Sequence, residues 1–286
     1  MILSVVVITH NEEANVGRTL ASVQPLVADG KGEIIVVDSG STDRTVEIAK
    51  SFGAKVFIEE WKGYAAQKNS AIDKATGDWI LSLDADEELE PDLAAELSIH
   101  QAISTANPAD RSRDWCLTME QASAGSRNLD KIKGPPTGYW IPRKNHVLGR
   151  WIQYGGFWPD PKLRLFRRGA GSFEDRAVHE DVRLDGPSGK LRGALLHHSY
   201  PTLADYIDHM NRYSSLGAEM AFAKGRPGFS LFNIVARPVA TFIYNYFFRL
   251  GFLDGREGLL LHLYHAAYVS WKYAKAWEFA RKNEPT

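Results

Sequence analysis

Apolar residues in the first 90 positions fall into short continuous runs separated by stretches of helical spacing. Residues 3–8 form a valine-rich run that predicts a strand buried on both faces. Val16, Leu20 and Val23 then recur at the spacing of one helix face. Strands that alternate with helices form βαβ crossovers, so we expect a mostly parallel sheet with helices on both faces. The expected strands are 3–8, 34–37, 55–58 and 79–83, and the expected helices are 12–23, 43–52 and 64–75.

The pattern changes beyond residue 90. Pro91 opens an expected helix that fades near Ala106, and the polar residues 107–134 show no clear periodicity, as in an insertion or a mobile loop. Turns rich in Gly and Pro then separate further strand-like segments at 139–142, 162–167 and 191–197, and the pattern is helical from Pro201 onward. We therefore predict an α/β domain over residues 1–200, with a nucleotide-binding half at 1–90, a polar insertion at 101–136 and a second half at 137–200, followed by a helical region at 201–286.

The composition is that of an ordinary globular protein. With 34 Lys and Arg against 35 Asp and Glu, the net charge of −1 gives no global field that would attract nucleic acid. The single cysteine, Cys116, excludes an internal disulfide and a Cys-based zinc site. The N-terminus shows no signal-peptide pattern, and the longest apolar stretches fall short of a spanning helix. We therefore expect a cytoplasmic protein.

Two carboxylates, Asp84 and Asp86, follow directly after the expected strand 79–83. Ligands of open α/β sheets bind outside the carboxyl ends of the strands. Carboxylates there suit Mg²⁺ or Mn²⁺ that carries substrate phosphates. Taken alone, however, an Asp-x-Asp is more often an ordinary acidic turn, so its meaning depends on the neighbouring strand ends.

The first two strands also end in polar residues. Thr9 and Glu12 follow the first strand and Asp38 follows the second, so their side chains can line the same pocket. The alternative is helix capping, by Asn11 for the first helix and by Thr42 or Asp43 for the second. No strand is followed by a Gly-x-Gly-x-x-Gly or a P-loop motif, which removes the main support for dinucleotide or P-loop binding.

These motifs resemble, in order, those of family 2 glycosyltransferases of the GT-A fold. The matching segments are residues 5–13 (VVVITHNEE), 37–43 (VDSGSTD) and 84–87 (DADE). The resemblance implies that Glu12 and Asp38 contact the uracil and ribose of a nucleotide sugar and that Asp86 holds a Mg²⁺ or Mn²⁺ ion on its diphosphate. It further places Thr9, Lys68, Asn69, Asp84 and Ala85 near the donor; for Lys68 and Asn69 a solvated helix face is an equal alternative.

The second half is similar to the lipopolysaccharide core glycosyltransferases of the WaaE/KdtX-like subgroup. The matching segments are residues 142–145, 148–152, 155–160, 162–168, 178–180 and 250–255. Residues 137–200 would then line the acceptor side. The region from about residue 101 to 136 is longer and more polar than is usual in that subgroup, which leaves the acceptor contacts open.

Sugar transfer from a nucleoside diphosphate sugar needs two things. Positive charge must neutralise the phosphates of the leaving group, and a base must take the proton of the acceptor hydroxyl. Arg164 can supplement the metal, although it can equally lie on the solvent face of its strand. The resemblance points to Glu180, after Val-His, as the base, with Asp181 second. For His197 we favour a hydrogen-bonded core position, whereas His198 is a candidate metal ligand.

Residues 242–252 and 259–277 combine many aromatic side chains with Arg and Lys. Such a mixture suits a membrane interface; packed helices or a dimer contact are equal alternatives. We expect a metal-dependent, inverting glycosyltransferase on the inner face of the cytoplasmic membrane. It would move a sugar, with glucose from UDP-glucose favoured, to lipopolysaccharide core or another lipid-linked saccharide. The alternatives are an inactive nucleotide-sugar-binding or scaffold protein and, less favoured, a nucleotidyltransferase.

Overall fold

The computed structural model describes residues 2–106, 135–174, 181–225 and 228–282. The chain divides into two compact units. The sheet unit comprises the described residues within 1–143, 161–176 and 180–197, and the helical unit comprises those within 144–160 and 198–286.

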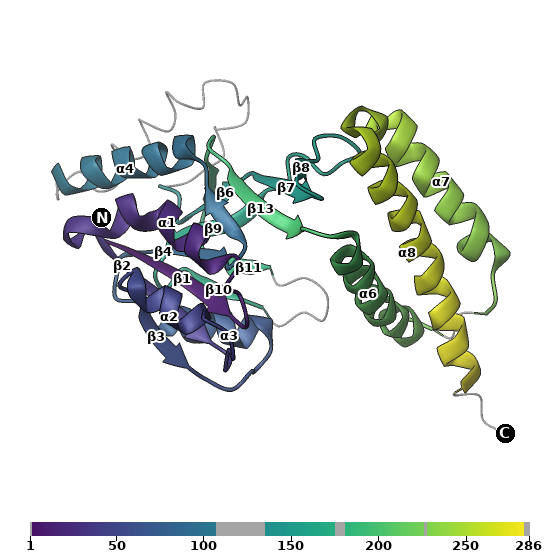
Figure 1. Ribbon diagram of the computed structural model, residues 1–286, viewed down its shortest axis with the longest axis horizontal. Coiled ribbons are helices and arrows are strands. Elements are labelled where there is room, and N and C mark those ends of the chain that lie inside the picture. The colour runs from purple at the N-terminus through teal and green to yellow at the C-terminus, as the bar shows by residue number, and fades with distance from the viewer. Residues whose placement is uncertain (1, 107–134, 175–180, 226–227, 283–286) are drawn as a thin grey trace. The chain divides into compact units, whose positions relative to one another are not determined.

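The sheet unit is built on one seven-stranded sheet (Figure 1). Strands β1 (Leu3–Thr9), β2 (Gly32–Asp38), β3 (Lys55–Ile58) and β4 (Trp79–Asp84) are parallel, in the order β4-β1-β2-β3. Strand β9 (Lys162–Arg167) pairs antiparallel with β4 and with β6 (Gly138–Ile141), and β12 (Ser188–Lys190) pairs parallel with β6. The carboxyl ends of β1, β2 and β4 therefore meet at one edge.

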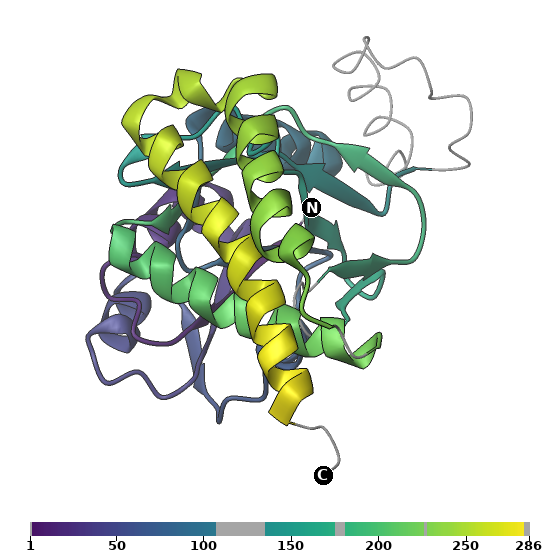
Figure 2. The same ribbon diagram turned by 90° about the vertical axis from the view of Figure 1, so that its right-hand side faces the viewer.

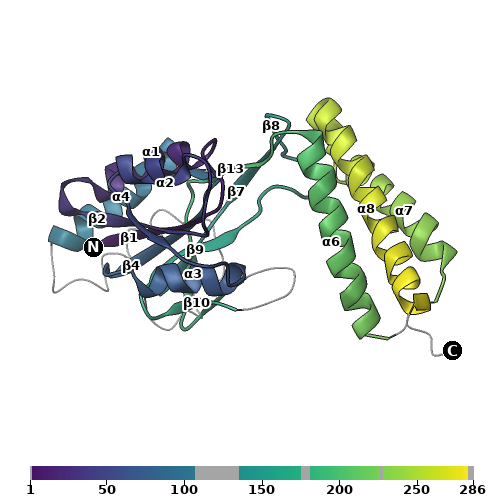
Figure 3. The same cartoon turned by 60° about the horizontal axis from the view of Figure 1, so that its bottom comes forward.

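Helices cover both faces of this sheet, as Figure 3 shows. Helices α1 (Val16–Val27), α2 (Thr45–Ser51) and α4 (Pro91–Ala106) contribute to one apolar core, and α3 (Tyr64–Asp73) contributes to the other. Alternate residues of β1 serve the two cores: Val5 and Val7 face the first, and Val6 faces the second. A strand buried on both faces must be apolar throughout, which explains the valine-rich runs.

Two smaller pairings complete the sheet unit. Strand β5 (Glu87–Leu89) pairs antiparallel with the first half of β13 (Leu195–Tyr200), and β10 (Gly171–Phe173) pairs antiparallel with β11 (Val182–Leu184). A short 3₁₀ turn, η1 (Ala28–Gly30), follows α1. Strand β5 begins directly after the acidic turn, so its pairing holds the end of that turn in place.

The helical unit contains α6 (Leu203–Ala223), α7 (Arg237–Ile243) and α8 (Gly255–Lys282), and α8 packs against both α6 and α7 (Figure 2). A capping box of Thr202 and Asp205 starts α6. Two π-helical turns, η4 (Phe232–Ala236) and η5 (Tyr244–Phe248), extend α7 at its two ends, and a 3₁₀ turn, η6 (Gly251–Asp254), leads into α8. Strands β7 (Arg143–Val147) and β8 (Arg150–Trp151) form a short hairpin before the helices.

The expected fold class is confirmed: a mostly parallel sheet carries helices on both faces, and a helical region follows. The expected strand at 191–197 begins later, at Leu195. Residues 144–160, which the sequence grouped with the sheet, cluster with the C-terminal helices. The insertion expected at 101–136 lies largely outside the described residues, although α4 extends to Ala106. None of the helices in the described ranges is both long and apolar enough to cross a membrane.

Candidate active site

Three strand ends meet at the carboxyl edge of the parallel sheet. In the strand register Thr9 lies beside Asp38, and Ile8 lies beside Asp84. The Thr9 hydroxyl donates to Asp38 Oδ2 at 2.7 Å. The residues that the sequence singled out after three separate strands therefore share one edge.

Asp38 is completely buried and accepts four hydrogen bonds. The hydroxyls of Thr9 and Ser41 donate to Oδ2 at 2.7 and 2.5 Å, and the backbone N–H groups of Gly40 and Ser41 donate to Oδ1 at 3.0 and 2.7 Å. Gly40 has φ +81°, which a glycine adopts without strain. Asp38 thus organises the turn after β2, and a ligand would have to replace one of these donors to reach its carboxylate.

The loops after β1 and β2 are tied together. The Asn11 N–H donates to Ser41 Oγ, and Asn11 Oδ1 accepts from the Thr42 N–H, both at 2.8 Å. Asn11 is therefore a bridge between loops, and the residue before α1 is Asn15, whose side chain makes no cap. Asp43 Oδ1 accepts from the N–H of Thr45, the first residue of α2, at 3.0 Å. Asp43 therefore binds the first N–H of α2 from one position before Arg44, which holds the N-cap position without a side-chain cap, and Asn11 caps no helix.

Glu12 lies within the electrostatic reach of the acidic turn. Burial raises the pKa of this carboxyl, the hydrogen bond from Asn15 Nδ2 lowers it, and the negative charges of Asp86, Asp43 and Asp84 raise it further. The negative charges of these neighbours disfavour the ionised form of Glu12 and give this place a local negative potential. Such a potential attracts a cation to this edge of the sheet.

The first aspartate of the turn is held between two buried cations. Asp84 accepts from Lys68 Nζ at 2.8 Å and forms an ion pair with Arg164. Burial alone would raise the pKa of Asp84, but the charges of Arg164 and Lys68 hold it well below its usual range. Both carboxylate oxygens of Asp84 are therefore paired with protein cations, although its side chain, 29% exposed, is no more buried than that of Asp86 at 26%.

Glu87 extends this network and was not singled out from the sequence. It is fully buried and accepts from Arg164 Nη2 at 2.7 Å and from Arg143 Nη1 at 3.0 Å. Its other oxygen accepts from the Asp84 N–H at 3.0 Å. The sequence shows Glu87 three residues after Asp84, which was the one signal that it belongs to the acidic turn. Its partners Arg143 and Arg164 are distant in the chain, so the sequence did not reveal the network. Arg164 consequently points at Asp84 and Glu87, and the pKa of its guanidinium is raised by these carboxylates against the effect of burial.

Asp86, the second aspartate, is half-buried, and its Oδ2 lies 3.2 Å from Nε2 of His197. Between the two aspartates, buried Ala85 accepts from the Thr19 hydroxyl of α1 through its carbonyl at 2.6 Å. This bond anchors the turn to α1. His197, for which the sequence favoured a core position, is therefore the histidine beside Asp86.

Of the remaining sequence candidates, His198 and Asp181 are among the described residues and Glu180 is not. His198 belongs to the helical unit, where its ring stacks on His146 with centroids 5.5 Å apart. Asp181 is exposed immediately before β11. Glu180 lies outside the described residues.

Lys68 and Asn69 are neighbours on α3 with different partners. Lys68 is buried, and its ammonium lies over the Phe173 ring, 5.0 Å from the centroid, in addition to its bond with Asp84. Asn69 exchanges two hydrogen bonds with the Phe173 backbone, at 2.8 and 2.9 Å. Lys68 thus joins the candidate site, whereas Asn69 fastens α3 to β10.

A divalent ion would find few protein ligands here. Within the described ranges no group of three His, Cys, Asp or Glu side chains is arranged to hold a metal. Mg²⁺ in phosphate-transfer sites uses one or two carboxylates and takes its other ligands from substrate phosphates and water. Asp86, with His197 beside it and the negative potential around Glu12, fits an ion that arrives with a diphosphate.

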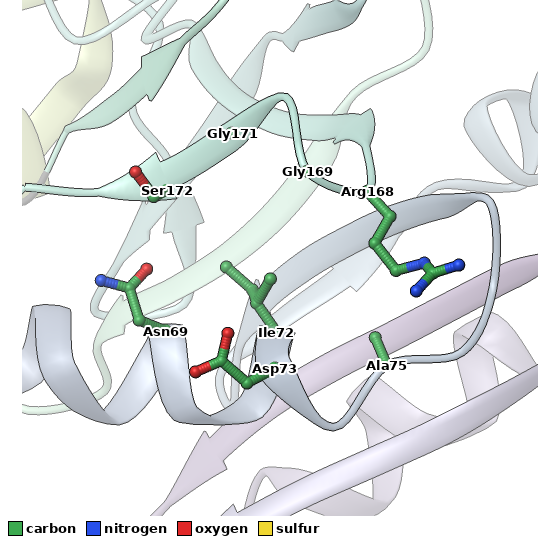
Figure 4. Close-up of a pocket in the computed structure, with 8 residues that line it drawn as sticks. All are labelled: Asn69, Ile72, Asp73, Ala75, Arg168, Gly169, Gly171 and Ser172. Atoms are coloured by element: carbon green, nitrogen blue, oxygen red, sulfur yellow. The ribbon is translucent and has the colours of Figure 1, made fainter.

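A cavity of about 360 Å³ in the sheet unit lies away from these residues. Figure 4 shows it between the end of α3 and the turn from β9 to β10, with Asn69, Asp73, Arg168 and Ser172 among its lining residues. Because β9 runs antiparallel to β4, this turn lies near the amino end of β4, where Arg168 Nε donates to the Gly77 carbonyl at 2.9 Å. None of the candidate donor or metal residues except Asn69, which the resemblance placed near the nucleotide, lines this cavity.

Sequence comparison with known proteins identifies glycosyltransferases as relatives of this chain. The family model described as Glycosyl transferase family 2 matches residues 4–104. An uncharacterized glycosyltransferase of Rickettsia felis is 31% identical over 268 residues, covering 90% of this chain and 83% of the relative. The lipopolysaccharide core biosynthesis glycosyltransferase LpsC of Rhizobium meliloti is 28% identical over 289 residues, covering 96% and 92%. The solved structure of S. aureus TarS 1-349 with UDP aligns over 99% of this chain and 92% of its own at 16% identity, with a TM-score of 0.46.

Proposed function

Since the chain belongs to glycosyltransferase family 2, we propose that it moves a hexose from a nucleoside diphosphate sugar to a lipid-linked glycan with inversion at the anomeric carbon. The observation that carries this proposal is the meeting of Thr9, Asp38 and Asp84 at one sheet edge, directly before Asp86. Ligands of open α/β sheets bind at this edge.

The donor in this proposal is UDP-glucose. Glu12, with Thr9 and Asp38, is assigned to the nucleoside. The turn around Ala85 is assigned to the diphosphate. Lys68 and Arg164 hold Asp84 in place, so these three residues act as a fixed wall of the donor site. Because the charges of these three residues are already paired, the residues can orient a substrate without changing their own positions.

Mg²⁺ or Mn²⁺ is assigned to Asp86. The contact between Asp86 and His197 supports His197 as the neighbouring ligand, where the sequence favoured His198. A divalent ion at this position supplies positive charge to the leaving diphosphate. The protein's own part is to present the Asp86 carboxylate from the turn and the His197 imidazole from β13, while both oxygens of Asp84 stay in its ion pairs.

Glu180 is assigned as the general base, with Asp181 as the second candidate. Its carboxylate takes the proton from the acceptor hydroxyl while the new glycosidic bond forms and the bond to the diphosphate oxygen breaks. Attack from the face opposite the leaving group inverts the configuration.

The acceptor in this proposal is lipopolysaccharide core or a related lipid-linked saccharide. The support is the similarity to the lipopolysaccharide core biosynthesis glycosyltransferase LpsC of Rhizobium meliloti, which extends over almost the whole chain. Such an acceptor is anchored in the cytoplasmic membrane, so the enzyme is assigned to the inner face of that membrane.

The test is a panel of nucleotide sugars incubated with the full chain and Mn²⁺, with and without EDTA, followed by release of the nucleoside diphosphate. We expect one or a few donors, UDP-glucose first, to be hydrolysed slowly and EDTA to stop the reaction. An inactive binding protein would bind donors in calorimetry without hydrolysing any of them.

Matched variants distinguish the two candidate bases. Glu180→Gln should lose at least about 100-fold in transfer to a lipid-linked acceptor, because a general base contributes on that scale, while donor binding is kept. Asp181→Asn serves as the control and should stay within a few-fold of the wild type. The reverse result would assign the base to Asp181.

A further inference from the structure

Exposed apolar residues repeat every four positions along the arm formed by η4, α7 and η5. Pairs of adjacent residues face solvent at each repeat, and every member of every pair is apolar or aromatic. The pairs are Leu231/Phe232, Val235/Ala236, Val239/Ala240, Ile243/Tyr244 and Phe247/Phe248.

A period of four does not fit an ordinary α-helix. With 3.6 residues per turn, a four-residue repeat drifts around the helix by roughly 40° at each step. The π-helical turns η4 and η5 are closed by longer hydrogen-bonded loops and therefore hold more residues per turn than α7 between them. Their combination keeps the five pairs on one side of the arm.

This side of the arm is apolar where a protein surface is ordinarily polar. Phe232 is 64% exposed and Phe248 is 75% exposed. The exposed apolar surface continues into η6 and the first turns of α8 through Leu250, Phe252, Leu253, Leu259 and Leu263. We call the exposed apolar residues from Leu231 to Leu263 the docking face. Contiguous apolar surface of this kind marks a binding site rather than ordinary surface.

The arm itself carries charges of one sign, and Glu257, whose side chain is 30% exposed and lies 3.8 Å from Arg150, is the one acidic side chain between Leu231 and Leu263 that is not buried. No Asp or Glu occurs from residue 225 to 253, and the first acidic residue after that, Asp254, is buried. Arg237, Arg249 and Arg256 are exposed along the same segment. Arg237 lies against the Phe232 and Tyr273 rings, 5.9 and 5.1 Å from their centroids, so its guanidinium lies beside the apolar stripe.

We propose that the docking face inserts into the interface of a bilayer that carries anionic headgroups. Apolar side chains would enter the acyl boundary, and the arginines beside them would meet the headgroup phosphates. The arm would lie in the plane of the membrane, because none of the helices in the described part of the chain can cross one.

Charge decides between this occupant and a second copy of the chain. In a two-fold contact the same surface lies on both partners. The docking face would then bring three exposed arginines from each copy together, with Glu257, which already lies beside Arg150, as the one acidic side chain available to meet them. An anionic lipid surface supplies the opposite charge and the apolar phase together. This inference concerns membrane binding alone and does not depend on the donor or acceptor of the proposed function.

The experiment is flotation of the full chain, without substrate, on vesicles of equal parts phosphatidylcholine and phosphatidylglycerol, compared with phosphatidylcholine alone. The wild type should float with the anionic vesicles and bind the neutral ones more weakly. Val239→Glu/Phe248→Glu should lower the vesicle affinity at least about tenfold, because it places two charges in the inserted stripe. The control is Ile58→Glu, which alters a 67% exposed residue of β3 in the sheet unit and should float like the wild type.

Three outcomes would overturn the inference. In the first, the wild type fails to float with anionic vesicles. In the second, the double variant floats as well as the wild type does. In the third, sedimentation velocity shows that the wild type is a dimer and the double variant a monomer, while flotation is unchanged. Circular dichroism and urea denaturation establish that the double variant is folded.

Discussion

The sheet unit buries charges at its carboxyl edge, whereas the helical unit exposes apolar side chains along its arm. In the sheet unit Glu87 and Arg164 are removed from solvent, and each has an oppositely charged partner. In the helical unit Phe232, Phe247 and Phe248 face outward. Both arrangements cost free energy. The buried charges lose their hydration, and the exposed apolar side chains remain in contact with water.

The comparison shows how each unit departs from the ordinary distribution of residues at the place where it would bind something. Buried charges keep a fixed geometry because any movement would leave one of them unpaired. An exposed apolar stripe is stable only with a partner that removes it from water. The first arrangement suits a polar, charged donor, and the second suits a lipid surface.

The largest expected effect tests whether the buried network is structural. Glu87→Gln leaves Arg143 and Arg164 without a full counter-charge in a buried site, so we expect a loss of about 3–5 kcal/mol in the free energy of unfolding. Urea denaturation measures it. Glu47→Gln breaks the exposed pair with Arg44 and should cause no measurable change. Equal stabilities of the two variants would show that the network is not essential to the sheet unit.

The next prediction separates the two aspartates of the turn. Asp86→Asn should lower the turnover of the preferred donor with Mn²⁺ by roughly 100–1,000-fold, on the scale of losing one electrostatic contact to the transition state. Its free energy of unfolding should stay close to that of the wild type, because Asp86 is half-buried. The control is Asp92→Asn in the first turn of α4. Turnover within tenfold of the wild type would remove Asp86 from the reaction.

A smaller effect compares the two units by pH. Burial lowers the pKa of His100 in the sheet unit and of His262 in the helical unit to about 4. Each imidazole is neutral in the folded protein, so its contribution to stability is present above about pH 6.5 and is lost as the pH falls toward 4. When the pH falls from 7 to 5, we expect each of these two histidines to lower the free energy of unfolding by about 1–2 kcal/mol.

Urea denaturation of His100→Leu and His262→Leu at both pH values checks this expectation. Each variant should lose less stability on acidification than the wild type does. His262 is the sharper case, because neither ring nitrogen has a hydrogen-bond partner within the described ranges. A variant that keeps the wild-type pH dependence would mean that its histidine is not held neutral by the fold.

The smallest effect concerns the docking face. Val239→Glu/Phe248→Glu should change the free energy of unfolding by less than about 0.5 kcal/mol per site, because both residues are exposed. Leu20→Ala, in the core of the sheet unit, should cost about 2–5 kcal/mol. A large destabilisation of the double variant in urea would show that the arm packs within the protein rather than outside it.

Much of the sheet and of its site could be predicted from local sequence. Valine-rich runs define strands because both faces are buried, and the polar residues that follow each run must lie at the carboxyl edge of a parallel sheet. Thr9, Asp38, Asp84 and Asp86 were found in this way. The antiparallel β9 and the grouping of residues 144–160 with the helices depend on contacts between distant segments, which no local pattern reveals.

The choice between His197 and His198 shows a finer limit. Neighbouring residues in a strand point to opposite faces, so a shift of one position changes which of two adjacent histidines is the candidate ligand. Only the pairing of β13 with β5, which sets His197 opposite Glu87, places that imidazole beside Asp86. The roles of Arg164 and Glu87 were equally hidden, since their partners lie dozens of residues away in the chain.

The sequence by itself determined the family, the fold class and the strand ends that carry the site, because these depend on short-range periodicity and on ordered motifs. The tertiary structure alone decided which charges are paired and which apolar residues are exposed. Pairing and exposure depend on what packs across from a residue, and a linear pattern contains the residue without its neighbours. The four-residue repeat of the arm was already present in the sequence, but only the packing of its other side showed that the apolar pairs face outward.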